Sequence, residues 1–122
     1  MSNSGTVSVY DLTTSETFFS LSQYDTVDID KMTASFYTSS GGNNTYPTNY
    51  TMTWRVIVTL PDNSTKNYEK TITKADSYGN YRNLSDKIRF AAQSSGTYKI
   101  KIRVYCSQST SGTAYLNTNC RC

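Results

Sequence analysis

The sequence contains no histidine in its 122 residues, so it lacks the side chain that most often transfers protons near neutral pH. Without histidine there is no base for a Ser-His-Asp or Cys-His catalytic arrangement, and the commonest zinc ligand is missing. No glycine-rich phosphate loop is present, because the Gly41-Gly42 pair lies in a polar segment. We therefore predict that the protein is not an enzyme, has no catalytic residues and uses no cofactor.

Charged residues and long apolar runs are also scarce. Charged residues make up 17 % of the chain, against about 25 % in typical domains, and the net charge of +3 includes no block of like charge. No segment approaches the ~20 apolar residues that cross a bilayer, and the N-terminal region lacks a basic stretch followed by an apolar run. We predict no nucleic-acid partner, no membrane insertion and no signal peptide in this chain.

Apolar residues are fewer than usual, at 36 % against about 45–50 %. Serine and threonine instead number 17 and 19, so the surface is expected to be hydrated mainly through hydroxyl and amide groups rather than charged groups. Such a composition suits an extracellular or assembled β protein, and we expect an extracellular or cell-surface location.

Period-two alternation recurs along the chain and helical periodicity almost never does, which predicts an all-β fold. The predicted strands are Thr6–Leu12, Thr17–Ser22, Thr26–Thr38, Tyr50–Leu60, Thr65–Lys74, Lys87–Ala92, Tyr98–Cys106 and Thr113–Cys120. About eight short antiparallel strands indicate a single-domain two-sheet β-sandwich over residues 1–122, with jelly-roll and immunoglobulin-like topologies both open. Residues 1–5 and 118–122 are expected to be mobile or to contact a partner.

Two of these strands are expected to carry the core. The inward face of one strand is predicted to be Tyr50, Met52, Trp54, Val56, Val58 and Leu60, and that of the other Tyr98, Ile100, Ile102, Val104 and Cys106. In Thr26–Thr38 the apolar parity shifts by one residue, which predicts a bulge near Asp30 and Lys31.

Three cysteines, Cys106, Cys120 and Cys122, cannot all pair within one molecule. A final hairpin turning near Ser109 would place Cys106 opposite Thr113, about 20 Å from Cys120 along the ladder, which is too far for a bridge. We expect the three cysteines to cross-link subunits. The alternatives are that Cys106 is a buried apolar residue, and that Cys120 and Cys122 are thiols of a frayed tail or part of a metal clip.

Three tyrosines, Tyr46, Tyr78 and Tyr81, lie in the polar segments Ser39–Asn49 and Ser77–Asn83, which are predicted to be loops. Exposed aromatic rings stack on sugars or anchor protein contacts at a small entropic cost. These tyrosines are therefore the candidate contacts for a glycan or a host protein.

The acidic residues Asp25, Asp28 and Asp30 are the candidate metal ligands, because alternate carboxylates on one strand face lie about 7 Å apart and suit calcium. Val27 and Ile29 alternate with them, as in an ordinary half-buried strand whose acids face water. We therefore predict no metal site.

A basic stripe, Lys99, Lys101 and Arg103, ends at Tyr105. Such a stripe can follow a phosphate backbone, but lysines on a strand more often face solvent or discourage edge pairing. A contact between this stripe and the acidic strand of another subunit is a third interpretation.

Together these features predict a non-enzymatic structural subunit that assembles with copies of itself into a disulfide-cross-linked extracellular fibre or surface layer. Edge-strand contacts would join the subunits. The alternative is a secreted recognition module that binds a glycan or a protein partner through its Tyr/Asn-rich loops.

Overall fold

The computed structural model describes residues 2–40, 42–46, 50–72 and 75–122. Strands make up 71 % of it, and the described residues form no helix, so none that could cross a membrane. Their strands are β1 (Ser2–Thr13), β2 (Thr17–Leu21), β3 (Thr26–Ser40), β4 (Asn43–Thr45), β5 (Met52–Thr59), β6 (Thr65–Ile72), β7 (Asn80–Asn83), β8 (Ile88–Ala91) and β9 (Gly96–Arg121).

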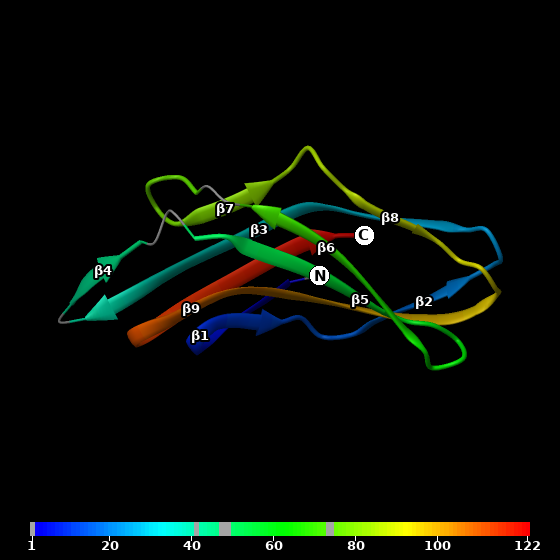
Figure 1. The fold of residues 1–122 in the computed structure, drawn as a ribbon, viewed down its shortest axis with the longest axis horizontal. Coiled ribbons are helices and arrows are strands. Elements are labelled where there is room, and N and C mark those ends of the chain that lie inside the picture. The colour runs from blue at the N-terminus through cyan, green and yellow to red at the C-terminus, as the bar shows by residue number, and fades with distance from the viewer. Residues whose placement is uncertain (1, 41, 47–49, 73–74) are drawn as a thin grey trace.

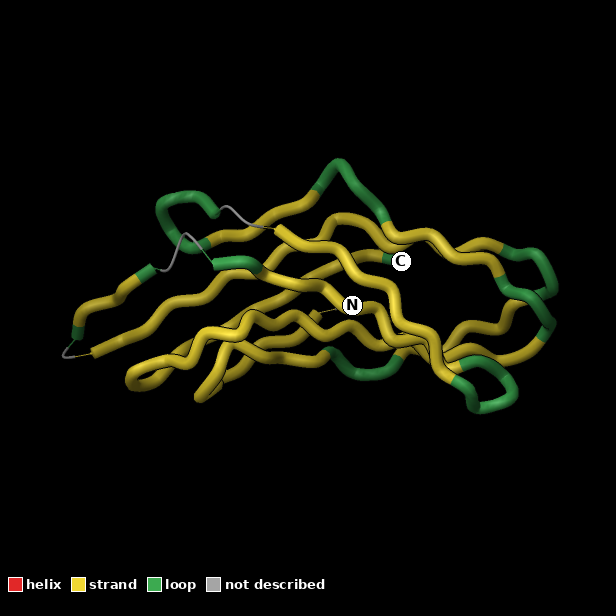
Figure 2. Tube along the Cα trace, in the orientation of Figure 1, coloured by secondary structure: helices red, strands yellow, loops and turns green. Residues whose placement is uncertain are grey.

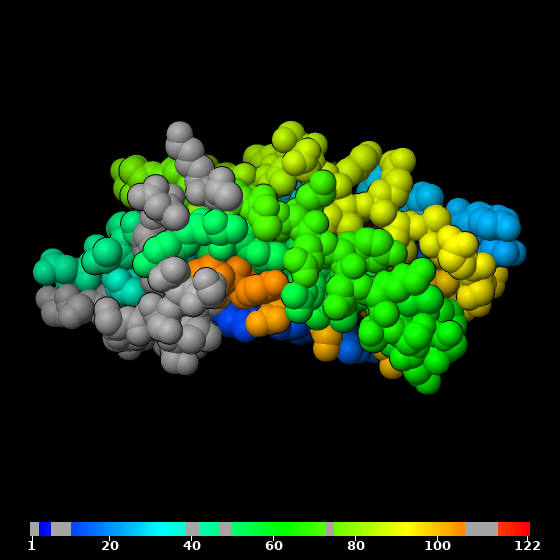
Figure 3. Space-filling model, viewed as in Figure 1, coloured from blue at the N-terminus to red at the C-terminus, as the bar shows by residue number. Residues whose placement is uncertain are grey.

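Two antiparallel sheets pack against each other, which confirms the predicted β-sandwich (Figure 1). In the first sheet, β6 pairs with β5, β5 with residues 99–105 of β9, and the other side of β9 with β2. In the second sheet, residues 113–121 of β9 lie between β1 and β3, and the far side of β3 pairs with β4, β7 and β8. Figure 3 is seen from the side of β5 and β6, whose side chains are green.

The paired strands β1 and β9 pass together from one sheet to the other. Between the pairs Val7↔Ala114 and Asp11↔Tyr105, β9 uses more residues than β1, and the register shifts on both sides of Val9. Such irregularities bend a strand, and Figure 2 shows the paired strands folding back at one end of the molecule. Among the described residues the two limbs of β1 and β9 bring the count to eleven strands, more than predicted.

The core lies between the two sheets and confirms the predicted inward faces. Met52, Trp54, Val56 and Val58 of β5 are buried, as are Tyr98, Ile100, Ile102, Val104 and Cys106 of β9. Tyr50 and Leu60, on either side of β5, are partly buried and pack against this core. The second sheet contributes Val27, Ile29, Met32, Ala34, Phe36, Tyr81, Ile88, Phe90, Leu116 and Cys120. The predicted bulge is present, because the register of β3 against β9 shifts between Asp30 and Thr33, and Lys31 has a φ of 55°.

Two segments predicted to be loops contain strands. Within Ser39–Asn49, β4 forms a hairpin with the end of β3, whereas residues 41 and 47–49 lie outside the described part. Within Ser77–Asn83, β7 pairs with β3 from Met32 to Ser35. Both strands are too short to show a period-two alternation in the sequence, and their hydrogen bonds to β3 define them.

The prediction of a simple final hairpin was wrong. Thr113 pairs with Ser39, whereas the neighbourhood of Cys106 pairs with β5 and β1, so the two limbs of β9 belong to different sheets. The two chain ends are paired with each other. Ser2 to Gly5 pairs with Asn119 to Leu116, and Thr118 and Cys120 are buried. The structure therefore places both terminal segments within the second sheet.

Candidate functional site

Four tyrosine rings form a continuous row on the outer surface of the second sheet. Tyr37 of β3 stacks on Tyr115 of β9, with 4.8 Å between ring centroids, because the two residues are direct cross-strand partners. Tyr46 follows at 6.0 Å from Tyr37, and Tyr78 at 6.1 Å from Tyr46. Tyr46 and Tyr78 are 37 % and 68 % exposed. The row therefore exposes aromatic surface to solvent.

The turn that carries Tyr78 is held by Asp76. The Asp76 carboxylate accepts hydrogen bonds from the main-chain amides of Tyr78 (2.8 Å) and Asn80 (3.1 Å), and from the Asn80 side chain (2.9 Å). Gly79, with a φ of 71°, lies in this turn, where a left-handed conformation favours glycine. The Asn80 hydrogen bond is the main reason that the pKa of Asp76 is lowered. The Asp76 carboxylate therefore fixes the main chain at Tyr78.

Tyr46 is positioned by the β3–β4 hairpin, which pairs Thr38 with Thr45. The Asn44 side chain donates a hydrogen bond to the Tyr46 hydroxyl at 3.5 Å. Tyr37 lies one residue before Thr38 on β3 and Tyr46 one residue after Thr45, so the hairpin brings Tyr46 beside Tyr37.

Amide and hydroxyl side chains continue the same surface beyond the tyrosines. Two residues before Tyr37, Ser35 lies between Asn117 of β9 and Asn80 of β7. Two residues earlier again, Thr33 lies between Asn119 and Arg82. Successive rows are about 7 Å apart, because alternate residues of a strand share a face. We call this surface the tyrosine–amide face: Thr33, Ser35, Tyr37, Tyr46, Tyr78, Asn80, Tyr115, Asn117 and Asn119.

The tyrosine–amide face is hollowed on both sides of β3. The larger hollow, about 440 Å³, is lined by Asn3, Ser4, Thr33, Asn117, Thr118 and Asn119. The smaller hollow, about 150 Å³, is lined by Thr33, Ala34, Ser35, Asn80 and Arg82. Both are open and polar, and they share Thr33. Their combined lining can donate and accept hydrogen bonds along the sheet.

Aspartates oppose the arginines bordering this face. Arg82 lies 3.5 Å from the Asp76 carboxylate, and Arg121 lies 3.1 Å from Asp30. Asp30 accepts two hydrogen bonds from Arg121, which is the main reason that its pKa is lowered. The positive charge at this border is therefore partly balanced within the chain.

Tyr81, predicted to be an exposed contact, is in the core and is 0 % exposed. Its ring stacks on Phe36 at 5.2 Å, and its hydroxyl accepts a hydrogen bond from the Tyr50 amide at 3.1 Å. Burial raises the pKa of Tyr81. Pairing of β7 with β3 turns alternate residues inward, so Tyr81 is buried while Arg82 on the same strand is exposed.

The three cysteines are thiols, and they differ in access. Cys106 and Cys120 are buried in the core, with Cys120 only 1 % exposed, whereas Cys122 is exposed. Burial raises the pKa of the Cys120 thiol to about 12 and also raises the pKa of Cys122. A thiol with a raised pKa is mostly protonated at neutral pH, so it is a poor nucleophile. Of the three predicted cross-linking residues, only Cys122 is accessible in this fold.

The predicted acidic cluster is divided among other partners. Arg89 donates two hydrogen bonds to Asp28, at 2.6 and 2.9 Å, and these bonds lower the pKa of Asp28 to about 2. The carboxylate of Asp25 accepts a hydrogen bond from the Ser22 amide at 2.8 Å, within a turn. Asp30 faces Arg121. Among the described residues, no three acidic, histidine or cysteine side chains form a metal-binding group.

The basic stripe lies on the first sheet and forms a network with its neighbours. Arg103 makes two hydrogen bonds to Asp11, at 2.8 and 2.6 Å, and its guanidinium lies 4.1 Å from the centre of the Tyr105 ring. Arg55 donates to the Tyr105 hydroxyl at 2.9 Å and to Glu69 at 2.8 Å. The arginine and tyrosine groups of the stripe are therefore engaged within the sheet.

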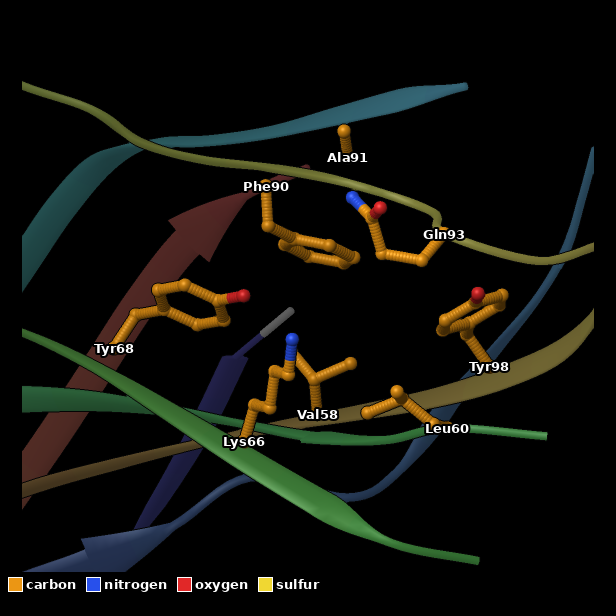
Figure 4. A pocket seen from close by; sticks show the side chains of 8 residues that line it. All are labelled: Val58, Leu60, Lys66, Tyr68, Phe90, Ala91, Gln93 and Tyr98. Carbon is orange, nitrogen blue, oxygen red and sulfur yellow. The ribbon is translucent and has the colours of Figure 1, made fainter. Parts of the chain in front are cut away.

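An apolar pocket opens between β5, β6 and β8 (Figure 4). It is lined by Val58, Leu60, Lys66, Tyr68, Phe90, Ala91, Gln93 and Tyr98, and its interior of about 10 Å³ holds a single water at most. Ligand pockets usually measure about 300–1,000 Å³. This pocket is a gap at the edge of the core rather than a ligand site.

Comparisons with models of protein families, with curated proteins and with solved structures find no match to this chain.

Sequence reasoning identified Tyr46 and Tyr78 but missed Tyr37, Tyr115 and the amide rows. Tyr37 alternates with the buried Phe36, and Tyr115 alternates with the buried Leu116. The outward parity of both tyrosines was therefore readable from the sequence. Their cross-strand pairing was not, because it depends on the register of β3 against β9.

Proposed function

We propose that this protein is a non-enzymatic recognition module that binds a glycan outside the cell through the tyrosine–amide face. The observation that carries the proposal is the row Tyr115–Tyr37–Tyr46–Tyr78, which continues directly into rows of amide and hydroxyl groups. Aromatic rings offer flat apolar area to the C–H faces of sugars, and amides and hydroxyls exchange hydrogen bonds with sugar hydroxyls.

A glycan array tests this proposal with variants of the two most exposed rings of the row. Tyr46→Ala and Tyr78→Ala should each weaken binding by about tenfold, the equivalent of roughly 1.4 kcal/mol. Phe18→Ala is the matched control, because Phe18 is 61 % exposed on a strand of the other sheet. Equal losses in all three variants, or no glycan bound by the native protein, would contradict the proposal.

The role of Asp76 offers a second test that leaves every ring in place. Asp76→Ala removes the acceptor that holds the Tyr78 turn, so glycan binding should weaken while the fold persists. Asp62→Ala is the control, because Asp62 accepts bonds from Ser64 in the β5–β6 turn. An Asp76→Ala variant that binds as tightly as the Asp62→Ala variant would show that the turn does not position the ring for binding.

Self-assembly is a second candidate function, supported by the exposed Cys122 and by the edges of the first sheet. Among the described strands, β2 pairs only with β9 and β6 only with β5, and β2 carries the exposed Phe18. An exposed edge can accept a strand from another copy. Oxidation of two Cys122 thiols by dioxygen would form one disulfide, with the electrons and protons passing to the oxygen.

Gel electrophoresis with and without reductant, together with electron microscopy, tests this second function. Because a chain carrying only one accessible thiol forms dimers rather than ladders, the filament itself must persist in the Cys122→Ser variant, held by edge contacts. A native protein that stays monomeric in both lanes and shows no filaments contradicts self-assembly.

A further inference from the structure

The ligand class of the tyrosine–amide face follows from its charge. Thr33, Ser35, Asn117 and Asn119 are uncharged, and the bordering Arg82 and Arg121 face Asp76 and Asp30. The outer face of the first sheet instead carries Lys99, Lys101, Arg55 and Arg103 against the acids Asp11 and Glu69. A site that selected sulfated or acidic sugars would be expected to leave cations available, as Arg and Lys clusters do when they bind anions. The tyrosine–amide face suits an uncharged ligand.

The length of the ligand follows from the geometry of the face. The aromatic row lies at the Tyr37 end of β3, and the larger hollow is lined by Asn117, one strand row away, and by Thr33 and Asn119, two rows away. Each row adds about 7 Å. Asn117 connects the two regions, because it is paired with Ser35 and also lines the larger hollow. A single sugar on the tyrosines would leave this hollow empty.

The Thr33 and Thr118 hydroxyls donate to main-chain carbonyls, at 3.4 and 3.1 Å, and these bonds fix the floor of the larger hollow. Above that floor, Asn117 and Asn119 are exposed. Each amide has one acceptor oxygen and two N–H donors, which match the mixed donor and acceptor character of neighbouring sugar hydroxyls.

Resting on the glycan-binding function proposed above, we infer that the ligand is a neutral oligosaccharide chain. The oligosaccharide runs along β3 and β9, with one part stacked on the tyrosine row and another hydrogen-bonded to Asn117 and Asn119 in the larger hollow. Binding therefore needs several sugar units at once, and the tyrosine row and the larger hollow contact different units of the oligosaccharide.

A length series tests this inference. Soluble neutral polysaccharides, such as a xylan, a mannan, a β-glucan and a starch, are screened by affinity electrophoresis. Oligosaccharides from the single sugar to the hexasaccharide are then prepared from the polysaccharide that binds best, and the affinity of each is measured by calorimetry. Affinity should rise by about tenfold or more along the series and should not fall with salt, because no ionic contact contributes.

Two amide variants test whether Asn117 and Asn119 bind the part of the oligosaccharide that extends beyond the tyrosine row. Asn117→Ala and Asn119→Ala should flatten the length series, so that the hexasaccharide binds little more tightly than the shortest binding oligosaccharide, whereas Tyr46→Ala should weaken every member and keep the rise with length. Asn67→Ala is the matched control, because Asn67 is an exposed amide of β6 on the other sheet. Thermal denaturation of each variant checks that the fold is intact.

The outcomes separate the two levels of the proposal. If the single sugar binds as tightly as the hexasaccharide, or if acidic glycans bind best with a steep salt dependence, the neutral-chain inference fails while glycan binding stands. If no glycan binds, the proposed function itself fails. Binding to cells that survives enzymatic removal of their glycans would point to a protein partner and would overturn both.

Discussion

Gly96 begins β9 at the place where the turn between β5 and β6 approaches it most closely, so a single added methyl group should be costly. Its φ is +151°, outside the conformations that other residues usually adopt, and a Cβ there would lie 2.7 and 2.8 Å from the Cγ and Cβ atoms of Pro61. Holding alanine in such a conformation costs about 1–3 kcal/mol. The overlap with the proline ring adds about 1–3 kcal/mol, as overpacking typically does.

Gly96→Ala should therefore destabilise the protein by about 2–6 kcal/mol, a large part of the roughly 5–15 kcal/mol that holds a typical domain folded. Urea denaturation followed by tryptophan fluorescence measures this directly, because Trp54 is buried in the core. With a slope of about 1.5 kcal/mol per molar urea, a loss of about 3 kcal/mol lowers the midpoint by about 2 M.

Two other glycines separate the two causes. Gly42 has a φ of +81° with no atom within 4 Å of an added Cβ, so Gly42→Ala should cost only the backbone strain, about 1–2 kcal/mol. At Gly5 the nearest atom is 3.6 Å away, an ordinary contact, so Gly5→Ala should change stability by less than about 1 kcal/mol. The double variant Gly96→Ala with Pro61→Ala should recover only the part of the steric cost that comes from Cγ, because alanine keeps the Cβ atom that lies 2.8 Å from the added methyl group. A Gly96→Ala variant no less stable than Gly42→Ala would refute this reasoning.

Three further predictions concern the core, the acid-sensitive ion pair and the thiols. Trp54 Nε1 is buried without a hydrogen-bond partner among the described residues, so Trp54→Phe should cost less than about 1.5 kcal/mol, as the lost packing is offset by removal of that donor. Because this variant contains no tryptophan, its urea denaturation is followed by circular dichroism. The pKa of Asp28 is lowered from 3.8 to about 2 by its hydrogen bond to Arg89, so its stabilisation is complete above pH 3.8 and is lost as the pH falls towards 2. Thermal denaturation across this window should show a steeper decline for the native protein than for Asp28→Asn, and parallel curves would contradict this. A maleimide should label one thiol in the folded protein and all three after unfolding, and Cys122→Ser should abolish the native label, because Cys120 is 1 % exposed; rapid labelling of that variant would show that the core opens.

The predictable part of the fold lies where side-chain alternation is long. Alternation with a period of two predicted the strands that contain Trp54 and Ile102, because one face of each strand is buried. A shift in the same alternation predicted the bulge at Lys31. The missed strands β4 and β7 are short and polar, and they exist because the edge of β3 supplies their hydrogen bonds. Local sequence carries little information about such pairing.

The candidate site was also predictable only in part. The sequence alone determined that catalytic equipment built on histidine is absent, that the fold is a β-sandwich, and that tyrosine, amide and hydroxyl groups dominate the polar surface. Only the tertiary structure decided which of them meet: register brought Tyr37 against Tyr115, and the β3–β7 pairing buried Tyr81. The bend of β9 placed Cys106 and Cys120 on strands of different sheets, both facing the core. Alternation assigns a residue to a face within one strand, whereas contacts between residues distant in sequence depend on strand order and register, which no single segment specifies.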